Sequence, residues 1–176
     1  MKTSGTRASG FTLTELLVVL LIIAVLAAIA VPITKSVLAR SRMAACLSNL
    51  RQIGIGLESY LQDHADTLPN VAAGRKSKLE DVPVLETELA SYLANPETFH
   101  CPADHKVFKE SGCSYIWNST QSGRNRFRLE FFGKSGNDKR IPLVIDKEDW
   151  HPGENGSNFL YADLSASNKV KFGVNR

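Results

Sequence analysis

The chain of 176 residues has only three cysteines and only one long apolar run. So few cysteines exclude a small secreted scaffold that depends on many disulfides. A single run excludes a transporter with several membrane spans, because each span needs about 20 apolar residues. The sequence also lacks a G-x-S-x-G, H-E-x-x-H or P-loop motif. It is therefore expected not to be an enzyme.

Neither sign of charge is in large excess. The chain carries 21 basic and 18 acidic residues, and Lys2 and Arg7 supply two of the three units of net positive charge. A protein that binds phosphate backbones usually has a strongly basic domain, so no nucleic-acid partner is predicted. Eight Phe, four Tyr and two Trp can build a core, which excludes a disordered chain.

The unbroken apolar run is the clearest feature that the sequence does have. All sixteen residues from 16 to 31 are apolar. Residues 11–33 would form a helix of about 34 Å, which is long enough to span a bilayer. Because Lys2 and Arg7 precede the run, the positive-inside rule keeps the N-terminus in the cytoplasm and sends the rest of the chain across.

Three interpretations of this segment remain open at this point. An ordinary secretory signal would end at the A-x-A site that finishes with Ala30 and would release a secreted binding domain. A plain membrane anchor would not require any specific sequence before the apolar run. The third interpretation accounts for the residues that do precede it, GFTLTE at positions 10–15.

This hexapeptide and the apolar run after it resemble the class III signal of type IV pilins and type II secretion pseudopilins. The resemblance implies that a prepilin peptidase cleaves between Gly10 and Phe11 and methylates the new amino group of Phe11. It further implies that Glu15 takes part in filament assembly and that Pro32 bends the helix.

The expected organisation is a leader at residues 1–10, a transmembrane helix at 11–34, and an amphipathic helix with a globular head at 35–176. Apolar residues recur every three or four positions between Met43 and Leu61, which predicts an amphipathic continuation of the same helix to about Asp63. Cys46 lies on its apolar side and is expected to be a core residue.

Later segments predict a short helix and several strands. The helix is expected at residues 86–93, and the strands at 115–117, 126–131, 141–145, 158–162 and 169–172. The predicted fold class is therefore α+β. A long N-terminal helix, transmembrane and then amphipathic, would pack on a small antiparallel β-sheet head, which is the pilin fold that the resemblance implies.

A second resemblance involves the segment FHCPAD at residues 99–104. It is similar to the Phe-x-Cys-Pro-Ser/Ala-Asp motif of a pseudopilin-like subfamily in which a histidine precedes an apolar strand that ends in Asp-Gly-His. His151 and Asp163 match this C-terminal pattern. Leu164 and Ser165 replace the Gly-His pair, so no role of that second histidine is transferred.

The cysteines Cys101 and Cys113 enclose eleven residues. Closing this loop with a disulfide would stabilise the fold by about 3 kcal/mol, and we expect this bridge in a head outside the cytoplasm. One alternative is two free thiols. The other is a zinc site, with ligands drawn from Cys101, Cys113, His105, His100 and His151.

Acidic residues are frequent between positions 146 and 163. Oxygen ligands suit calcium, and the resemblance implies a calcium site in the C-terminal loops of major pseudopilins. Asp146, Asp149 and Asp163 are the candidates. The Asp-x-Asp-x-Asp-Gly pattern is absent, which favours an ordinary solvated loop, and no other cofactor is expected.

Three alternating basic residues, Arg124, Arg126 and Arg128, would share one face of the predicted strand at 126–131. A pilin for DNA uptake could use that face on phosphates. A solvated face or a subunit contact is favoured.

Together these patterns predict a pseudopilin-like subunit of a type II secretion system. It would cross the bacterial inner membrane once, with its head in the periplasm. It would assemble with copies of itself and other pseudopilins on an inner-membrane platform. The alternatives are a type IV pilin for adhesion, motility or DNA uptake, and a secreted binding domain released after Ala30.

Overall fold

The computed structural model describes residues 12–135, 138–153 and 155–171, so the predicted cleavage site at Gly10 and Phe11 lies outside the described residues. The chain divides into two compact units, with the division between Leu38 and Ala39.

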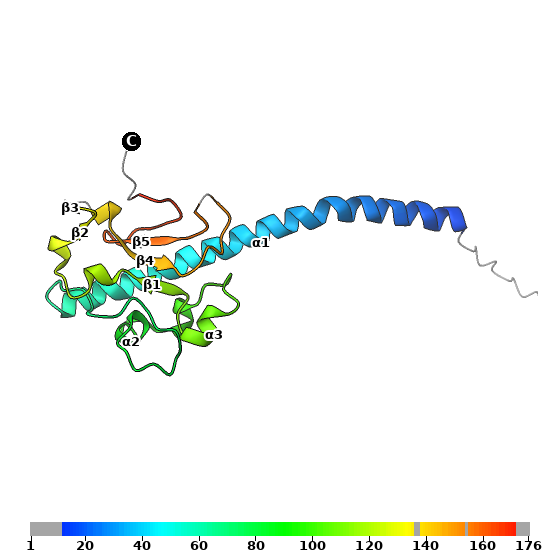
Figure 1. Ribbon diagram of the computed structural model, residues 1–176. Coiled ribbons are helices and arrows are strands. Elements are labelled where there is room, and N and C mark those ends of the chain that lie inside the picture. Colours follow the sequence, from blue (N-terminus) through cyan, green and yellow to red (C-terminus); the bar gives the residue numbers. More distant parts are fainter. Residues whose placement is uncertain (1–11, 136–137, 154, 172–176) are drawn as a thin grey trace, which may run out of the picture. The chain divides into compact units, whose positions relative to one another are not determined.

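The first element is one α-helix of 51 residues, α1 (Leu13–Asp63) (Figure 1). Pro32 lies inside this helix. Within the first unit its apolar side chains are exposed; Leu21, for example, is 62% exposed. The most apolar 18-residue window of α1 has a mean hydropathy of 3.3, so by length and composition this helix can cross a membrane. The described part of the chain thus contains the long helix that the sequence predicts.

In the second unit α1 has one buried face. The buried positions recur with helical periodicity: Cys46, Leu50, Ile53, Leu57 and Leu61. Gly56 also faces inward, and a Cβ atom there would lie 2.9 Å from the side chain of Leu93. Glycine therefore lets the chain at Leu93 approach the helix backbone closely.

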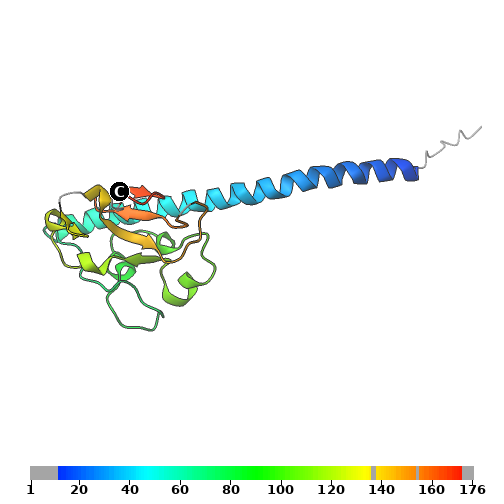
Figure 2. The same ribbon diagram turned by 45° about the horizontal axis from the view of Figure 1, so that its top comes forward.

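The buried face of α1 packs on an antiparallel sheet of four strands in the order β1-β4-β5-β6 (Figure 2). The strands are β1 (Tyr115–Trp117), β4 (Pro142–Asp146), β5 (Phe159–Tyr161) and β6 (Ala166–Ser167). Ile145 pairs with Ile116 on one side and with Phe159 on the other. This arrangement of a long helix and a small antiparallel sheet confirms the predicted α+β class.

Short elements connect these parts. They are α2 (Leu85–Glu88), α3 (Val107–Ser111), the small sheet of β2 (Glu130–Phe131) and β3 (Lys134–Ser135), and the 3-10 turns η1 (Pro96–Phe99), η2 (Ser119–Gln121), η3 (Arg126–Arg128) and η4 (Asp138–Arg140). The expected helix at 86–93 is therefore shorter than predicted, since α2 ends at Glu88.

Two predicted strands differ from the structure. Residues 126–131 form η3 and then β2, because the Asn125 side chain accepts a hydrogen bond from the amide of Phe127 and starts a turn. Among the residues that the structure describes, the last strand is β6, which precedes the predicted segment 169–172; residue 172 itself lies outside the described residues. Asp163 accepts a hydrogen bond from the amide of Ser165, and Leu164 has a φ of 60°, so the chain reverses directly after β5.

Candidate functional site

The helix α1 begins with a reciprocal pair of hydrogen bonds. Thr12 Oγ1 accepts from the amide of Glu15 at 3.2 Å. Glu15 Oε2 in turn accepts from the amide and the hydroxyl of Thr12, at 2.9 and 2.7 Å. This is a capping box, which satisfies amide groups that the first helical turn leaves unpaired. The pattern Thr-x-x-Glu before an apolar run is its usual signature, and it was not among the motifs named above.

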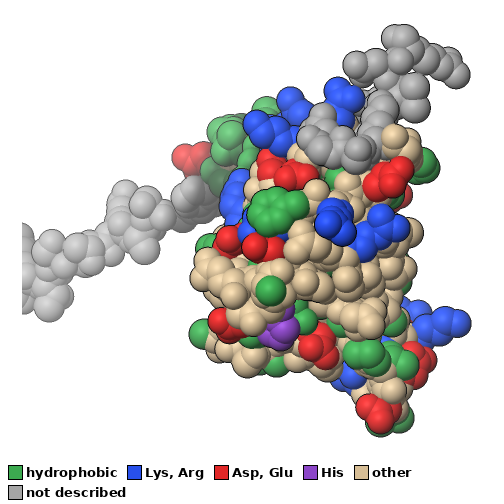
Figure 3. Space-filling model, turned by 90° about the vertical axis from the view of Figure 1, so that its left-hand side faces the viewer, with side chains coloured by type: hydrophobic (Ala, Val, Ile, Leu, Met, Phe, Trp, Pro, Cys, Tyr) green, Lys and Arg blue, Asp and Glu red, His purple; other side chains and the backbone are tan. Residues whose placement is uncertain are grey.

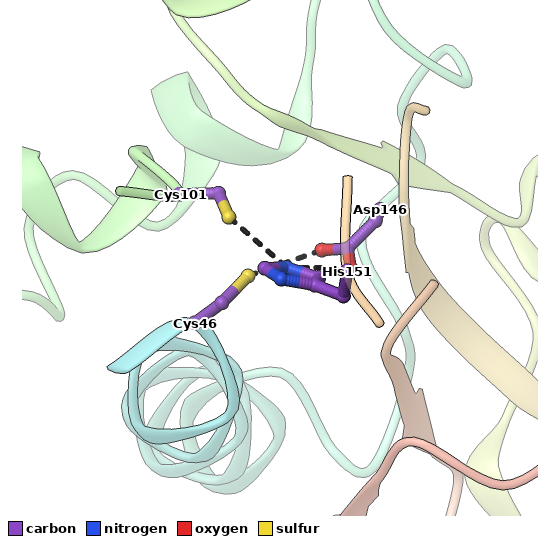
Figure 4. A group of neighbouring side chains, drawn as sticks. All are labelled: Cys46, Cys101, Asp146 and His151. Carbon is purple, nitrogen blue, oxygen red and sulfur yellow. Dashed lines mark hydrogen bonds and ion pairs between the residues drawn. The ribbon is translucent and has the colours of Figure 1, made fainter. Parts of the chain in front are cut away.

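Four buried side chains meet beside α1 in the second unit, and we call them the four-residue cluster: Cys46, Cys101, Asp146 and His151 (Figure 4). Their candidate ligand atoms all lie within 4.8 Å of one another. Cys46 Sγ donates to Asp146 Oδ1 at 3.2 Å. His151 Nε2 lies 3.2 Å from Cys101 Sγ and 3.4 Å from Asp146 Oδ2.

Four separate segments supply this cluster. Cys46 lies on the buried face of α1, and Cys101 lies two residues after the end of η1. Asp146 is the last residue of β4. His151 follows in the loop before β5, where its amide donates to the carbonyl of Gly156 at 2.8 Å.

The contacts within the cluster shift its acid–base equilibria. The hydrogen bond with Cys46 lowers the pKa of the Cys101 thiol, and the contact with His151 lowers it further, although burial opposes both. Burial raises the pKa of Asp146 to about 6. Burial also opposes a charge on His151, but the hydrogen bond and charge of Cys101 outweigh it and raise the pKa of the imidazole. The cluster therefore favours a thiolate at Cys101.

The segment at residues 99–104 holds Cys101 in place. Asp104 accepts hydrogen bonds at 2.8 Å from the amides of residues 106–108 and so caps α3. The Ser114 hydroxyl donates to Asp104 at 2.6 Å and accepts from the amide of Cys101 at 2.9 Å. In the FHCPAD segment, Asp104 therefore has a structural role, and Cys101 is a member of the four-residue cluster.

The expected disulfide between Cys101 and Cys113 is not formed, and all three cysteines are free. The Cys101 sulfur instead faces His151. Cys113 Sγ accepts a hydrogen bond from the amide of Tyr115 at 3.3 Å. The Cys101 sulfur thus contacts a residue 50 positions further along the chain.

The predicted metal ligands are only partly brought together. Of the three calcium candidates, Asp146 alone joins a ligand cluster within the described residues. Asp149 accepts from the hydroxyl of Ser157, and Asp163 from the amide and hydroxyl of Ser165. Of the zinc candidates, Cys101 and His151 lie in the cluster. It also contains Cys46, which is a buried core residue, as its place on the apolar side of the helix predicts.

The predicted arginine face is also absent, because residues 126–128 form the turn η3. Arg126 lies 3.0 Å from Glu58 and 3.5 Å from Asp66, so its charge is already paired within the head. The face of the molecule in Figure 3 mixes acidic and basic side chains. Neither observation favours a phosphate-binding surface.

Residues 5–31 match the family model of the prokaryotic N-terminal methylation motif. The N-terminus is a prepilin-type signal. No curated protein and no solved structure matches the chain. The matched residues include the capping box at Thr12 and Glu15, and they also include Gly10 and Phe11. The prepilin-type signal implies processing by a prepilin peptidase and assembly into a pilus or filament.

The prepilin-type signal includes most of the exposed apolar part of α1. An apolar surface of this length is stable in a lipid bilayer or against other apolar helices, and not in water. The signal and the helix together fit a membrane-anchored, pilin-like protein. The pilin-like arrangement of the described residues agrees with this.

The Asp104 cap predicts a measurable loss of stability. We expect Asp104→Ala to lower the free energy of unfolding by about 1–3 kcal/mol, because buried amide and hydroxyl donors lose their acceptor. Urea denaturation of the full chain in detergent, followed by tryptophan fluorescence, measures this value. Asp81→Ala, at an exposed loop position, is the matched control and should change it by less than about 0.5 kcal/mol. Equal stability of the two variants would contradict the role of the cap.

Proposed function

We propose that the chain is a pseudopilin-like structural subunit of a type II secretion system, which assembles through α1 into a periplasmic filament that helps drive protein export. One observation carries this proposal. The prepilin-type signal is continuous with a helix that is apolar on all sides at first and then has one face in the core of the head. Such a helix suits both a bilayer and a bundle of identical helices.

The proposed location follows from the same residues. Lys2 and Arg7 hold the leader in the cytoplasm, and the head folds in the periplasm. The prepilin peptidase is the first partner. After cleavage, the partners are copies of this chain, other pseudopilins and the inner-membrane assembly platform. The role is structural and not enzymatic, in keeping with the lack of a catalytic motif in the sequence.

The resemblance of residues 99–104 to a pseudopilin-like subfamily supports secretion over a pilus. The ion pairs of Arg126 with Glu58 and Asp66 give DNA uptake no support. A type IV pilin remains the second candidate, because the same signal directs both kinds of protein.

Two measurements test the proposal. The first is the N-terminal mass of the mature chain: a methylated Phe11 supports a filament subunit, whereas a chain that begins at Val31 would show a secreted domain. The second is a deletion strain of the native bacterium. Proteins that are normally exported should accumulate in its periplasm while surface pili remain. Normal export with loss of surface pili would instead identify a type IV pilin.

A further inference from the structure

The four-residue cluster is an unusual group to find in a protein core. Each member is at most 7% exposed. A buried carboxylate, imidazole or thiolate is costly unless it is paired or bound to a metal. The prepilin-type signal and the proposed filament role make no use of these side chains, so the cluster requires an explanation of its own.

The separations within the cluster fit a tetrahedral ion. Zinc binds sulfur at about 2.3 Å and nitrogen or oxygen at about 2.0–2.2 Å, which places neighbouring ligand atoms about 3.3–3.8 Å apart. The sulfur–nitrogen, sulfur–oxygen and nitrogen–oxygen pairs measured above are 3.2, 3.2 and 3.4 Å apart. The two Asp146 distances are to different carboxylate oxygens, and one ligand atom from each of the four residues can be chosen within 4.8 Å of the others. Side-chain adjustment would therefore be needed to bring four atoms around one centre.

Each residue that would bind a metal ion as an anion has a hydrogen-bonding group behind it. The backbone amide of Ala103 lowers the pKa of the Cys101 thiol. The hydroxyl of Tyr115 lies 3.3 Å from the Cys46 sulfur, and the amide of Asn158 donates to Asp146 Oδ2 at 2.6 Å. Outer donors of this kind orient metal ligands and stabilise their negative charge. A purely apolar role for the two cysteines would not need them.

We propose that the four-residue cluster binds one zinc ion, with both cysteines as thiolates, Asp146 through a carboxylate oxygen and His151 through Nε2. Two sulfurs, one nitrogen and one oxygen suit zinc, whereas calcium requires six to eight oxygen ligands. The protons of the thiols pass to solvent on binding. Since all four positions are filled by protein, the site is structural and has no open position for catalysis.

Metal titration of the full chain in detergent, under reductant, tests this assignment. With zinc alone as the probe, we expect one tightly bound ion per chain by elemental analysis after excess metal is removed. Cys46→Ser and His151→Gln should lose this stoichiometric binding. Cys113→Ser is the matched control, because it removes an equally buried thiol outside the cluster, and it should retain one ion.

Cobalt provides a second measurement that does not depend on how well the variants fold. Cobalt bound to the wild-type chain should show the visible absorption of a tetrahedral ion and the near-ultraviolet charge-transfer bands of thiolate ligands. A wild-type chain that binds neither metal would overturn the proposal. So would a Cys46–Cys101 disulfide in protein matured in the periplasm, or zinc binding that survives the loss of Cys46 or His151. These readouts do not involve filaments, so they leave the proposed function unaffected.

Discussion

Glu15→Gln protein is expected to be inserted and cleaved normally, while its incorporation into filaments is largely abolished. Cleavage would expose the amino group of Phe11, which is mostly cationic at neutral pH because such groups titrate near pH 8. In an apolar bundle of helices, a neighbour in the wrong register would leave this cation and the Glu15 carboxylate unpaired, which is costly. Glutamine removes the charge. Sheared filaments, quantified by immunoblot against the membrane fraction, provide the measurement.

The capping box makes this substitution more informative than alanine would be. Glutamine at the third helical position can still accept from Thr12, so Glu15→Gln keeps the cap and loses only the charge. Thr12→Ala is the complementary control, since it removes the two hydrogen bonds of the Thr12 hydroxyl and keeps the charge, and we expect it to assemble. Normal filament levels from cleaved Glu15→Gln protein would refute the charge-pairing role. An uncleaved variant would show that Glu15 serves the peptidase.

Gly10→Glu is expected to block maturation almost completely. The peptidase must accommodate this residue next to the scissile bond, and a long charged side chain would not fit where glycine does. The precursor should remain in the membrane at its full mass. Gly5→Glu introduces the same side chain within the leader but away from the bond, and it should be cleaved as usual. A mature N-terminus at Phe11 in the Gly10→Glu protein would contradict the requirement for a small residue at position 10.

Local sequence patterns predicted most of the longer elements, because the residues that define a helix or a strand are neighbours in the chain. The helix α1 follows from apolar periodicity over successive turns, and its predicted end at Asp63 is confirmed. The strands β1, β4 and β5 were each predicted to within one residue at both ends. The segment at 126–131 was misassigned, because the Asn125 side chain caps a turn that alternation of residue types does not reveal.

The four-residue cluster could not be predicted in the same way. Cys46 and His151 are 105 positions apart in the sequence, and what brings them together is the order of the strands and the return of the chain after β4. Loop length and a head outside the cytoplasm favoured the pairing of Cys101 with Cys113. The loop-closure estimate includes only the entropy of joining the two ends of the loop. It does not include the hydrogen bond between Ser114 and the amide of Cys101, which helps position this cysteine. The capping box, by contrast, was readable from four consecutive residues.

The position of α1 at the start of the chain has a consequence for biogenesis. A ribosome releases α1 first, but the strands that cover its buried face, β4 and β5, come from residues 142–161. The apolar side chains of Leu50, Ile53 and Leu57 therefore remain uncovered until most of the chain has been synthesised. Contacts of such long sequence separation form slowly, and exposed apolar surface favours aggregation meanwhile. Truncation before β5 should thus leave a chain with an uncovered helix, which quality-control proteases would degrade.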